Sequence, residues 1–269
     1  MPEGDTIFRA ARTLDRALAG ATVTRFETQL AQLARVDDDT PVAGRTVERV
    51  EAHGKWTHMV FSGDLILLTH MLMSGSWHIY RPGEAWQRPR SQMRIVVETA
   101  GFVAVAFLVQ VAEFHTGATL EHRRAVSTLG PDLLRSDFDP AEAARRIRAH
   151  ADLEIGEALL RQSLVAGVGN VFKSEVCFVC GIHPFRRNHT LSAAELDTLL
   201  ATARQLLRDN AGAVSGLRRT TRSLDPSARL WVYQRTGQPC RRCGVPIESR
   251  KQGPDARSTF WCPVCQPPP

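Results

Sequence analysis

Four cysteines near the carboxyl-terminal end of the chain constrain its fold more than any other feature. They form two Cys-x-x-Cys pairs, Cys240 with Cys243 and Cys262 with Cys265, and 18 residues lie between the pairs. Each pair presents two sulfur atoms at the spacing that a tetrahedral Zn²⁺ requires, and the interval is long enough for a β-hairpin. Two disulfide bonds are the alternative, but nothing else in the sequence suggests secretion. The sequence therefore predicts a zinc ribbon that holds one structural Zn²⁺.

The charge of the chain indicates a polyanionic partner without identifying it. Among 269 residues, 34 are Lys or Arg and 28 are Asp or Glu, and only three of the basic residues are lysines. Guanidinium groups suit bidentate contacts with phosphates. The sequence has no run of eighteen apolar residues and no basic leader before an apolar run, so we expect a cytoplasmic protein without a membrane partner. The other two cysteines, Cys177 and Cys180, lie in an apolar segment and are expected to be buried thiols.

The first half of the chain has the pattern of one helix followed by a β-rich domain. Thr6 can cap a helix that runs to about residue 19, with an apolar stripe that suits core packing. Short segments rich in Val, Ile and Thr then alternate with Gly, Pro and Asp turn signals. This spacing predicts an antiparallel β-sandwich or a flattened barrel. The expected strands are 22–28, 46–51, 57–61, 65–70, 77–80, 93–98 and 103–108.

The second half of the chain has helical patterns. Asp139 caps a helix that has Pro140 at its first position, and Ser192 with Glu195 forms a capping box. Between them, a turn that ends in Gly169 and Asn170 opens another helix. The N-terminus of that helix offers main-chain N–H groups and a positive dipole to a phosphate, although an ordinary helix hairpin has the same pattern. The expected helices are 139–150, 155–165, 170–180 and 192–210.

The residues after Met1 carry a candidate catalytic amine. Removal of Met1 would leave Pro2 as a terminal secondary amine. An α-amino group titrates near about 7.7–8.0, so part of it is neutral at physiological pH. Such an amine can attack an electrophilic carbon and form an iminium, and Glu3 beside it can supply acid–base chemistry. Most chains that begin Met-Pro-Glu have no such chemistry, so this hypothesis depends on the rest of the sequence.

Two loops in the β-rich half carry candidate contacts with a nucleic acid. Lys55 lies just before an expected strand and, taken alone, is a solvated loop lysine. Met71, Leu72 and Met73 follow another expected strand. These three side chains fit the protein core, but nucleic-acid proteins also use Met and Leu as wedges that enter a base stack.

Four segments together resemble a known family. They are Met1-Pro-Glu-Gly, Gly54-Lys55, Leu160-Arg-Gln-Ser-Leu-Val-Ala-Gly-Val-Gly-Asn170, and the cysteine ribbon with Arg257. In this order they resemble the formamidopyrimidine-DNA glycosylase / endonuclease VIII family of base-excision repair enzymes, and the resemblance spans the whole chain. It implies a multi-domain α+β fold with an N-terminal helix, an antiparallel β-sandwich, a helix-two-turn-helix domain and a zinc-ribbon hairpin. The expected ranges are 1–120 for the catalytic β-sandwich domain, 121–137 for a linker, 138–234 for the helical domain and 235–269 for the ribbon.

The resemblance also implies a role for individual residues. Pro2 is the expected nucleophile at C1′ of the damaged nucleotide, and Glu3 is the expected general acid–base. Lys55, Asn170 with the helix that follows it, and Arg257 are the expected phosphate contacts around a flipped nucleotide. The implied catalytic set is Pro2, Glu3, Lys55 and Arg257, and the implied DNA contacts are Met71, Leu72, Met73, Gly169, Asn170, Lys173 and Arg257.

Departures from the family pattern bear on the substrate. Asp5-Thr6 replaces Pro-Glu, so the carboxylate often found at the sixth position is missing. Residues 106–112 do not contain the Asp-Pro-Arg-Arg-Phe segment typical of the 8-oxoguanine branch, and 221–231 is short for a loop that covers oxidised purines. These features favour the endonuclease VIII branch and oxidised pyrimidines. The sequence around Met73, by contrast, resembles the purine branch.

The expected function is a bifunctional DNA glycosylase and AP lyase. It would act as a monomer in the bacterial cytoplasm, at the nucleoid, on damaged double-stranded DNA, and would cut the backbone by β,δ-elimination. The alternatives are an 8-oxoguanine/formamidopyrimidine-type glycosylase, an enzyme active only on abasic sites or single strands, and a non-catalytic zinc-ribbon protein that binds nucleic acid.

Overall fold

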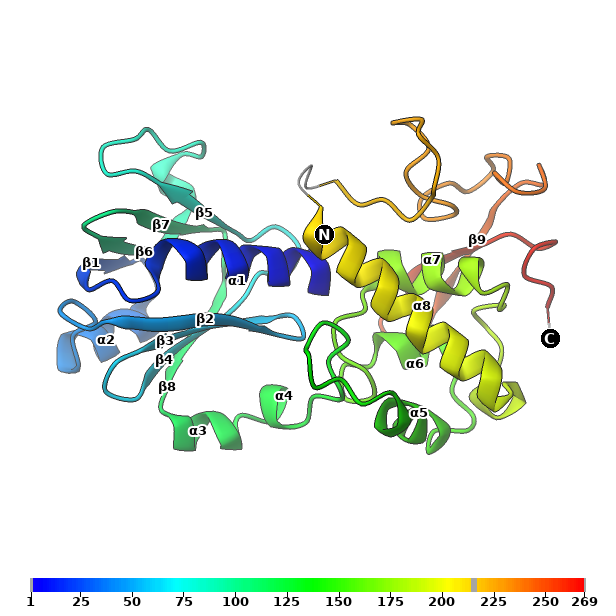
Figure 1. Cartoon of the computed structure of the whole chain (residues 1–269), viewed down its shortest axis with the longest axis horizontal. Helices are drawn as coiled ribbons and strands as arrows, with labels where there is room; N and C mark the ends of the chain where they lie inside the picture. Colours follow the sequence, from blue (N-terminus) through cyan, green and yellow to red (C-terminus); the bar gives the residue numbers. More distant parts are fainter. Residues whose placement is uncertain (1, 214–216, 269) are drawn as a thin grey trace. The chain divides into compact units, whose positions relative to one another are not determined.

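The computed structural model describes residues 2–213 and 217–268. The chain forms two compact units, Met1–Thr128 (unit 1) and Leu129–Pro269 (unit 2) (Figure 1). Unit 1 contains most of the β-structure, and unit 2 contains the longer helices and a two-stranded hairpin. The predicted mixed α+β fold is therefore confirmed. The division of unit 2 into a helical domain and a separate ribbon domain stays a prediction.

Unit 1 contains two four-stranded antiparallel sheets. One has the strand order β1-β6-β7-β5 and the other β2-β3-β4-β8. All seven expected strands are present within two residues of their predicted ends. The strands are β1 (Val23–Thr28), β2 (Val47–His53), β3 (Trp56–Phe61), β4 (Leu65–His70), β5 (Ser76–Tyr80), β6 (Met93–Thr99), β7 (Val103–Phe107) and β8 (Val111–His115).

The core of unit 1 lies between the two sheets. Period-two alternation separates the faces of β6, where Ile95 and Val97 join the main core while Val96 packs on the opposite face with Tyr80 and Phe107. The first helix, α1 (Gly4–Leu18), closes this core with an apolar stripe that includes Leu14 and Leu18. The stripe faces this core, and α1 lies along β2 (Figure 1).

Three differences from the predicted elements have local causes. α1 begins at Gly4 with Glu3 as its cap, not at Thr6, because the carbonyl oxygen of Glu3 already accepts the N–H groups of Thr6 and Ile7 at 2.9 and 3.0 Å. β8, which was not among the predicted strands, completes the second sheet. Its five residues are too few to show a clear alternation of apolar and polar side chains. The helix α2 was not predicted either, because Leu33 is its only fully buried residue and the sequence shows no clear apolar stripe there. The further helices of unit 1 are α2 (Ala31–Asp39), α3 (Gly117–His122), α4 (Arg124–Ser127) and the 3₁₀ turn η1 (Arg90–Gln92).

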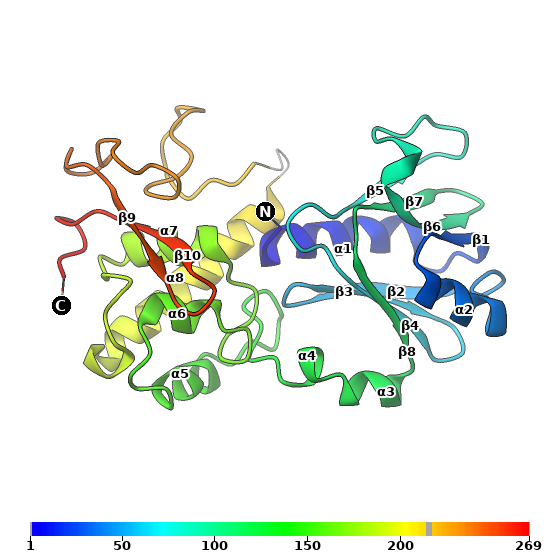
Figure 2. The same ribbon diagram turned by 180° about the vertical axis from the view of Figure 1, so that it is seen from behind.

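Unit 2 is built around a buried helix, α7, which contacts α6, α8 and the β9–β10 hairpin (Figure 2). Most of the side chains of α7 are buried, as its apolar sequence predicts. Asp139 and Ser192 cap α5 and α8 as expected. The elements are α5 (Pro140–Arg148), α6 (Ile155–Leu160), α7 (Asn170–Val179), η2 (Asn188–Thr190), α8 (Ala193–Gly212), β9 (Glu248–Gln252) and β10 (Arg257–Trp261).

The expected helix over 155–165 is too long, since α6 ends at Leu160. Beyond that residue the Gln162 side chain holds a compact loop. Its amide donates to the carbonyl oxygens of Leu160 and Val168, both at 3.0 Å, and its oxygen accepts the N–H of Gly167 at 3.0 Å. Among residues 2–213 and 217–268, none of the helices has the length and apolar character that a membrane span requires.

Candidate functional site

The N-terminal candidates lie at the start of α1. Pro2 is half-buried and precedes the helix, and Glu3 occupies the cap position with a fully buried side chain. Asp5 in the first turn is also buried, and the Thr6 hydroxyl donates to its carboxylate at 3.3 Å. The fold therefore holds a carboxyl group next to the residue whose amine is the candidate nucleophile.

Lys55 lies in the two-residue turn that joins β2 to β3. Gly54, the other turn residue, has φ +59°, a value that glycine adopts without strain in the first position of a type II′ hairpin turn. His70, at the end of the neighbouring strand β4, pairs with Trp56 across the sheet, and the two rings meet edge-on at 4.8 Å. Burial first, and the positive charge of Lys55 second, lower the pKa of His70 to about 4. A neutral imidazole thus accompanies the lysine at this edge of unit 1.

The loop after His70 separates the three candidate wedge residues. Met71 is only 2% exposed, whereas Leu72 and Met73 are 41% and 61% exposed. The turn is tight, because the Gly75 N–H donates to the Met71 carbonyl oxygen at 2.8 Å, and a Cβ on Gly75 would lie 2.5 Å from that oxygen. Met71 was expected among the DNA contacts. The structure instead places it in the interior, which leaves Leu72 and Met73 as the exposed pair.

In unit 2, the turn before α7 places Gly169 at the helix cap and Asn170 at the first helical position. The Asn170 side chain is 8% exposed, and its Nδ2 donates to the main-chain oxygen of Ser258 at 2.9 Å. Its Oδ1 has no hydrogen-bond partner among the residues that the structure describes. The amide group retains a second Nδ2 hydrogen for a ligand. Asn170 is therefore both part of the α7 N-terminus and a support for the hairpin.

Arg257 is the first residue of β10, directly after the hairpin turn 253–256. Its side chain is 46% exposed, and within residues 2–213 and 217–268 its ion-pair partner is Asp255, at 3.8 Å and itself 75% exposed. An exposed pair at that distance contributes little energy, so the guanidinium group can exchange Asp255 for a stronger anion. The register places Arg257 opposite Gln252.

A buried polar network fixes the hairpin that carries Arg257. Gln252 is 5% exposed and donates to Glu154 and to the Pro184 carbonyl oxygen, both at 2.9 Å. Its oxygen accepts the Thr259 hydroxyl at 2.8 Å, and Thr259 in turn accepts the Lys173 ammonium group. Lys173 was expected to contact DNA, but it is fully buried. The structure makes it part of this network instead.

The four ribbon cysteines converge on one point. Their sulfur atoms all lie within 4.8 Å of one another, with Sγ–Sγ distances of 3.9 Å for Cys240–Cys265 and 3.4 Å for Cys243–Cys262. Tetrahedral Zn²⁺ with Zn–S bonds of about 2.3 Å requires Sγ–Sγ distances of about 3.8 Å. Main-chain N–H groups point at two of the sulfurs, from Arg242 to Cys240 and from Cys265 to Cys262. The donor set therefore fits the predicted zinc, and the predicted structural zinc site is confirmed.

The structure groups the predicted residues by unit. Pro2, Glu3, Lys55 and the 71–73 loop belong to unit 1, whereas Asn170, Lys173, Arg257 and the cysteines belong to unit 2. Sequence reasoning missed His70 and Gln252. His70 had a signal, since it ends a strand one residue before the candidate wedge. Gln252 had none, because its partners lie 98 and 68 residues away in the chain.

Models of three protein families match the chain. Residues 1–109 match the formamidopyrimidine-DNA glycosylase N-terminal domain, and residues 129–221 match the formamidopyrimidine-DNA glycosylase H2TH domain. Residues 237–268 match a zinc finger found in FPG and IleRS. The three matches follow one another along the chain in the order that the sequence resemblance predicts.

Similar proteins cover the chain from end to end. It is 41% identical to "Probable endonuclease 8 2" of Streptomyces coelicolor, over 99% of this chain and 94% of that protein. It is 38% identical to "DNA-(apurinic or apyrimidinic site) lyase Nei2" of Mycolicibacterium smegmatis, over 99% of both chains. The fold is similar to that of formamidopyrimidine-DNA glycosylase of Lactococcus lactis bound to DNA with an AP site, with a TM-score of 0.82 at 21% identity over 99% of this chain and 100% of that one.

Proposed function

The chain belongs to the formamidopyrimidine-DNA glycosylase / endonuclease 8 family, and on this premise we propose that it is a base-excision repair DNA glycosylase with AP lyase activity. The observation that carries this proposal is the 41% identity to a probable endonuclease 8 over almost the whole of both chains. The Pro-Glu start at the head of α1 and the cysteine ribbon support it.

Pro2 and Glu3 are the proposed reacting groups. The Pro2 nitrogen attacks C1′ of the damaged nucleotide, the C1′–base bond breaks, and the base leaves with a proton. The C1′–O4′ bond then breaks as the ring oxygen takes a proton, which opens the sugar and leaves an iminium between Pro2 and C1′. This iminium makes a C2′ proton acidic, so its removal expels the 3′ phosphate, and a second elimination expels the 5′ phosphate. Glu3 is fully buried at the α1 cap. It is the proposed group that protonates the sugar ring oxygen during attack and moves protons afterwards.

The phosphates around the lesion are the proposed ligands of Lys55, Asn170 and Arg257. Lys55 is half-buried in a hairpin turn, Asn170 begins a helix whose dipole attracts an anion, and Arg257 has a loose ion pair with Asp255 to exchange. His70 beside Lys55 is neutral, and it accepts the Leu72 N–H at its Nδ1, at 3.1 Å. Its other ring nitrogen then carries the hydrogen and can donate to a phosphate.

Leu72 and Met73 are the proposed wedge. Chemistry at C1′ requires the damaged nucleotide to leave the base stack, which costs a few kcal/mol of unstacking energy. Two exposed apolar side chains on a tight turn can fill the space that the nucleotide vacates. The proposed partner is damaged double-stranded DNA bound by a monomer, and the proposed location is the bacterial cytoplasm.

Oxidised pyrimidines are the proposed preferred lesions. The support is the identity to endonuclease 8 proteins and the absence of the Asp-Pro-Arg-Arg-Phe segment. A second candidate is an enzyme whose main substrate is the abasic site itself. Thr6 in place of the usual carboxylate favours it, as does a relative named as an AP lyase. A panel of duplexes with thymine glycol, dihydrouracil, 8-oxoguanine or an abasic site separates the candidates by their cleavage rates.

Borohydride trapping tests the proposed chemistry. The protein is made with a cleavable N-terminal tag whose removal leaves Pro2 as the first residue. We expect the cleaved protein, mixed with abasic-site DNA and borohydride, to form a covalent adduct in which Pro2 carries the deoxyribose fragment. The uncleaved protein is the matched control, since its Pro2 nitrogen is an amide and cannot attack. An equal yield of adduct from both forms would reject Pro2 as the nucleophile, and no adduct from either would reject the enzyme.

A further inference from the structure

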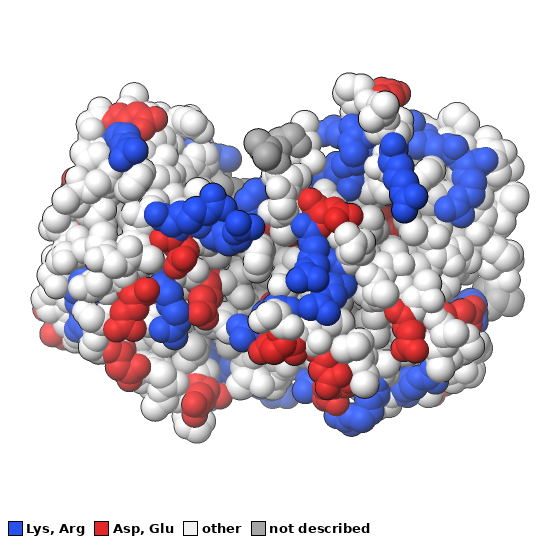
Figure 3. All heavy atoms as spheres, in the orientation of Figure 1, with Lys and Arg blue, Asp and Glu red and all other residues white. Residues whose placement is uncertain are grey.

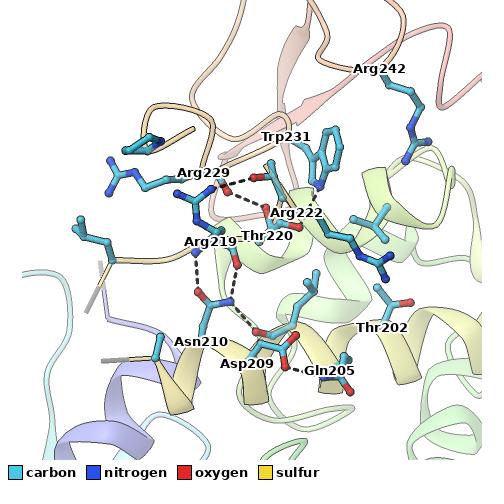
Figure 4. A pocket seen from close by; sticks show the side chains of 16 residues that line it. Thr202, Gln205, Asp209, Asn210, Arg219, Thr220, Arg222, Arg229, Trp231 and Arg242 are labelled. Atoms are coloured by element: carbon cyan, nitrogen blue, oxygen red, sulfur yellow. Dashed lines mark hydrogen bonds between the residues drawn. The ribbon is translucent and has the colours of Figure 1, made fainter. Parts of the chain in front are cut away.

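Unit 2 contains a hollow that the proposed reaction does not use. It has a volume of about 930 Å³ and lies between α8 and the segment that follows it, 217–231 (Figure 4). Its lining includes Thr202, Gln205 and Asp209 on α8, and the end of α7 at Val179. None of the residues proposed above for catalysis, phosphate binding or zinc belongs to the lining. The hollow is therefore a separate feature of this unit.

The wall formed by 217–231 is held in place by one buried carboxylate. Glu175 on α7 is fully buried and accepts the main-chain N–H groups of Trp231, Val232 and Tyr233 at 2.7, 2.9 and 2.8 Å. It also accepts the Thr220 hydroxyl. Both ends of the wall are thus tied to the central helix, and the hollow is a built cavity rather than a gap beneath a loose loop.

The positive charge of the chain is concentrated around this hollow. Residues 217–242 contain seven arginines, one aspartate and no lysine or glutamate, so their net charge of +6 equals that of the whole chain. Four of these arginines, Arg219, Arg222, Arg229 and Arg242, line the hollow. Figure 3 shows basic side chains gathered over the same part of unit 2. The surrounding field therefore favours an anionic ligand.

Three of the four arginines remain available to a ligand. Arg219 is engaged, because its Nη1 donates to the Ser223 carbonyl oxygen at 2.6 Å. Arg242 is exposed and lies over the rings of Phe178 and Trp231 at 4.6 and 5.8 Å. Within 2–213 and 217–268, neither Arg222 nor Arg229 forms an ion pair. Figure 4 shows Arg222 and Arg242 on one side of Trp231 and Arg229 on the other.

The remainder of the lining is apolar and polar in equal parts, and the polar part includes the carboxylate of Asp209. Val179, Leu206 and Leu217 contribute aliphatic side chains, and Leu217 is 58% exposed. Leu224, in the same segment, is 97% exposed. Exposed apolar side chains beside arginines suit a surface that binds proteins, because arginine is enriched in such interfaces and their buried centres are more apolar than the rest of the surface.

We propose that this hollow is a docking site for an acidic peptide segment of a partner protein that carries apolar side chains. The carboxylates of the peptide pair with Arg222, Arg229 and Arg242, and one apolar side chain enters the hollow against Leu206 and Leu217. Guanidinium–carboxylate pairs give such a site its selectivity for acidic chains, and the buried apolar side chain provides most of the affinity.

A single strand of nucleic acid fits the hollow less well. A phosphodiester chain matches the arginines but leaves the aliphatic lining without a partner. Base stacking needs a free aromatic face, and Trp231 already stacks on Phe178 at 5.3 Å with an interplanar angle of 28°. The indole N–H is also engaged, since it donates to the Thr220 carbonyl oxygen at 3.1 Å. The combination of arginine and leucine therefore favours the acidic peptide.

Fluorescence polarisation with three labelled heptapeptides tests the proposal on the full chain with zinc bound. The probe has five glutamates followed by two phenylalanines. One control replaces the glutamates by glutamines, and the other replaces the phenylalanines by serines. We expect the probe to bind at least tenfold more tightly than either control. Equal binding of all three peptides, or binding of none, would overturn the proposal.

Matched variants locate the binding site. Arg222→Glu and Leu217→Ser change exposed side chains, and each is expected to weaken the probe at least fivefold. Arg148→Glu is the control, since it makes the same charge change at an exposed position on α5. Equal effects of Arg222→Glu and Arg148→Glu would show that binding depends on the net charge of the protein and not on the hollow, and would reject the site.

Two further measurements separate a protein site from a nucleic-acid site. A probe with benzoylphenylalanine in place of one phenylalanine should crosslink to α8 or to 217–231, and an adduct mapped elsewhere rejects the site. A 12-nucleotide oligothymidylate should not displace the probe, and cleavage of abasic-site DNA should be unchanged in Arg222→Glu. Displacement by the oligonucleotide, or loss of cleavage in that variant, would assign the arginines to DNA instead.

Discussion

Asn170 donates a hydrogen bond of 2.9 Å from its side-chain nitrogen to the main-chain oxygen of Ser258. This bond joins the first residue of α7 to the residue that follows Arg257 on β10. This bond therefore links two parts of unit 2 that are far apart in the sequence, the N-terminus of α7 and the hairpin strand that carries the Arg257 guanidinium group. Asn170 thus has a positioning role in addition to its proposed contact with a phosphate.

Asn170→Ala should loosen the hairpin. The variant removes one nearly buried hydrogen bond, so we expect a loss of about 1 kcal/mol in the free energy of unfolding of unit 2. Hydrogen exchange measured by mass spectrometry should be faster in peptides that cover β9 and β10, while the sheets of unit 1 are unchanged. Affinity for abasic-site DNA should fall about tenfold or more. Unchanged exchange in the hairpin would show that Asn170 acts on the ligand alone.

The sequence predicted those parts of the molecule that local rules determine. Seven strands, the caps at Asp139 and Ser192, and the cysteine cluster all follow from patterns a few residues long. The burial of Met71 and of Lys173 did not follow from such patterns. A Met before an exposed turn and a Lys on a helix are usually outward-facing, and only the packed structure shows that one enters the core and the other bonds Thr259.

The buried polar groups of unit 2 were outside the reach of sequence reasoning for a physical reason. Glu175 and Gln252 each satisfy partners that are between 7 and 98 residues away in the chain. No periodicity marks such residues, because their role depends on which distant main-chain groups the fold brings to them. The same holds for the hollow beside α8, whose arginines are visible in the sequence but whose concave shape is not.

Removal of zinc should unfold the ribbon and leave unit 1 intact. The ribbon has little core of its own, so metal binding supplies much of its folding free energy. With a chelator, or in Cys243→Ser, we expect loss of binding to abasic-site DNA while the thermal transition of unit 1 persists. Normal DNA binding by Cys243→Ser would contradict the supporting role proposed for the ribbon.

Alkylation with iodoacetamide provides a second measurement of the effect of zinc removal, because it reports which cysteine thiols become accessible. In the chelated protein the four ribbon cysteines should react. Cys177 should stay unmodified, because it is fully buried and desolvation raises its pKa to about 12, so almost no thiolate is present at pH 8. The zinc-loaded protein is the control, in which the ribbon cysteines are protected. Rapid modification of Cys177 in the folded protein would contradict its placement in the core.

His70 should remain neutral at physiological pH. Burial and the charge of Lys55 lower its pKa to about 4 in the folded protein, whereas the unfolded chain has a value near 6.5. The unfolded state therefore binds more protons between these values, and the free energy of unfolding should fall as the pH decreases from 6.5 to 4. His70→Gln removes this contribution, so unfolding curves of the variant should depend less steeply on pH over that range.

NMR titration separates the two causes of the His70 shift. Lys55→Met removes the neighbouring charge but not the burial, so the pKa of His70 should rise and still stay below 6.5. Arg49→Met, which removes an exposed cation on β2, is the control and should leave the His70 signals unchanged. A wild-type pKa near 6.5, or a decrease in Lys55→Met, would contradict the proposed proximity of the two groups.

Glu175→Gln should destabilise unit 2 by about 1–3 kcal/mol. Each carboxylate oxygen accepts two hydrogen bonds, one oxygen from Val232 and Tyr233 and the other from Trp231 and Thr220. The glutamine amide replaces one of these acceptors by a donor. The Thr220 hydroxyl can accept from that amide nitrogen, but the Trp231 N–H then faces a donor and is left unsatisfied. Urea unfolding measures the loss. Glu248→Gln on the exposed strand β9 is the control and should change stability by less than about 0.5 kcal/mol. Equal stability of the two variants would reject the anchoring role of Glu175.

Gly156→Ala should displace the hairpin through Gln252. A Cβ on Gly156 would lie 2.5 Å from the Gln252 Oε1 and 2.9 Å from the Pro184 carbonyl oxygen, and the second of these is main chain that cannot rotate away. Overpacking of this kind costs about 1–3 kcal/mol. Because Gln252 pairs with Arg257 across the hairpin, affinity for abasic-site DNA should fall as well. Gly212→Ala, with nothing within 4 Å of its Cβ, is the control and should be neutral or slightly stabilising in calorimetry. A Gly156→Ala protein with the melting temperature and DNA affinity of this control would show that the Gln252 network does not position Arg257.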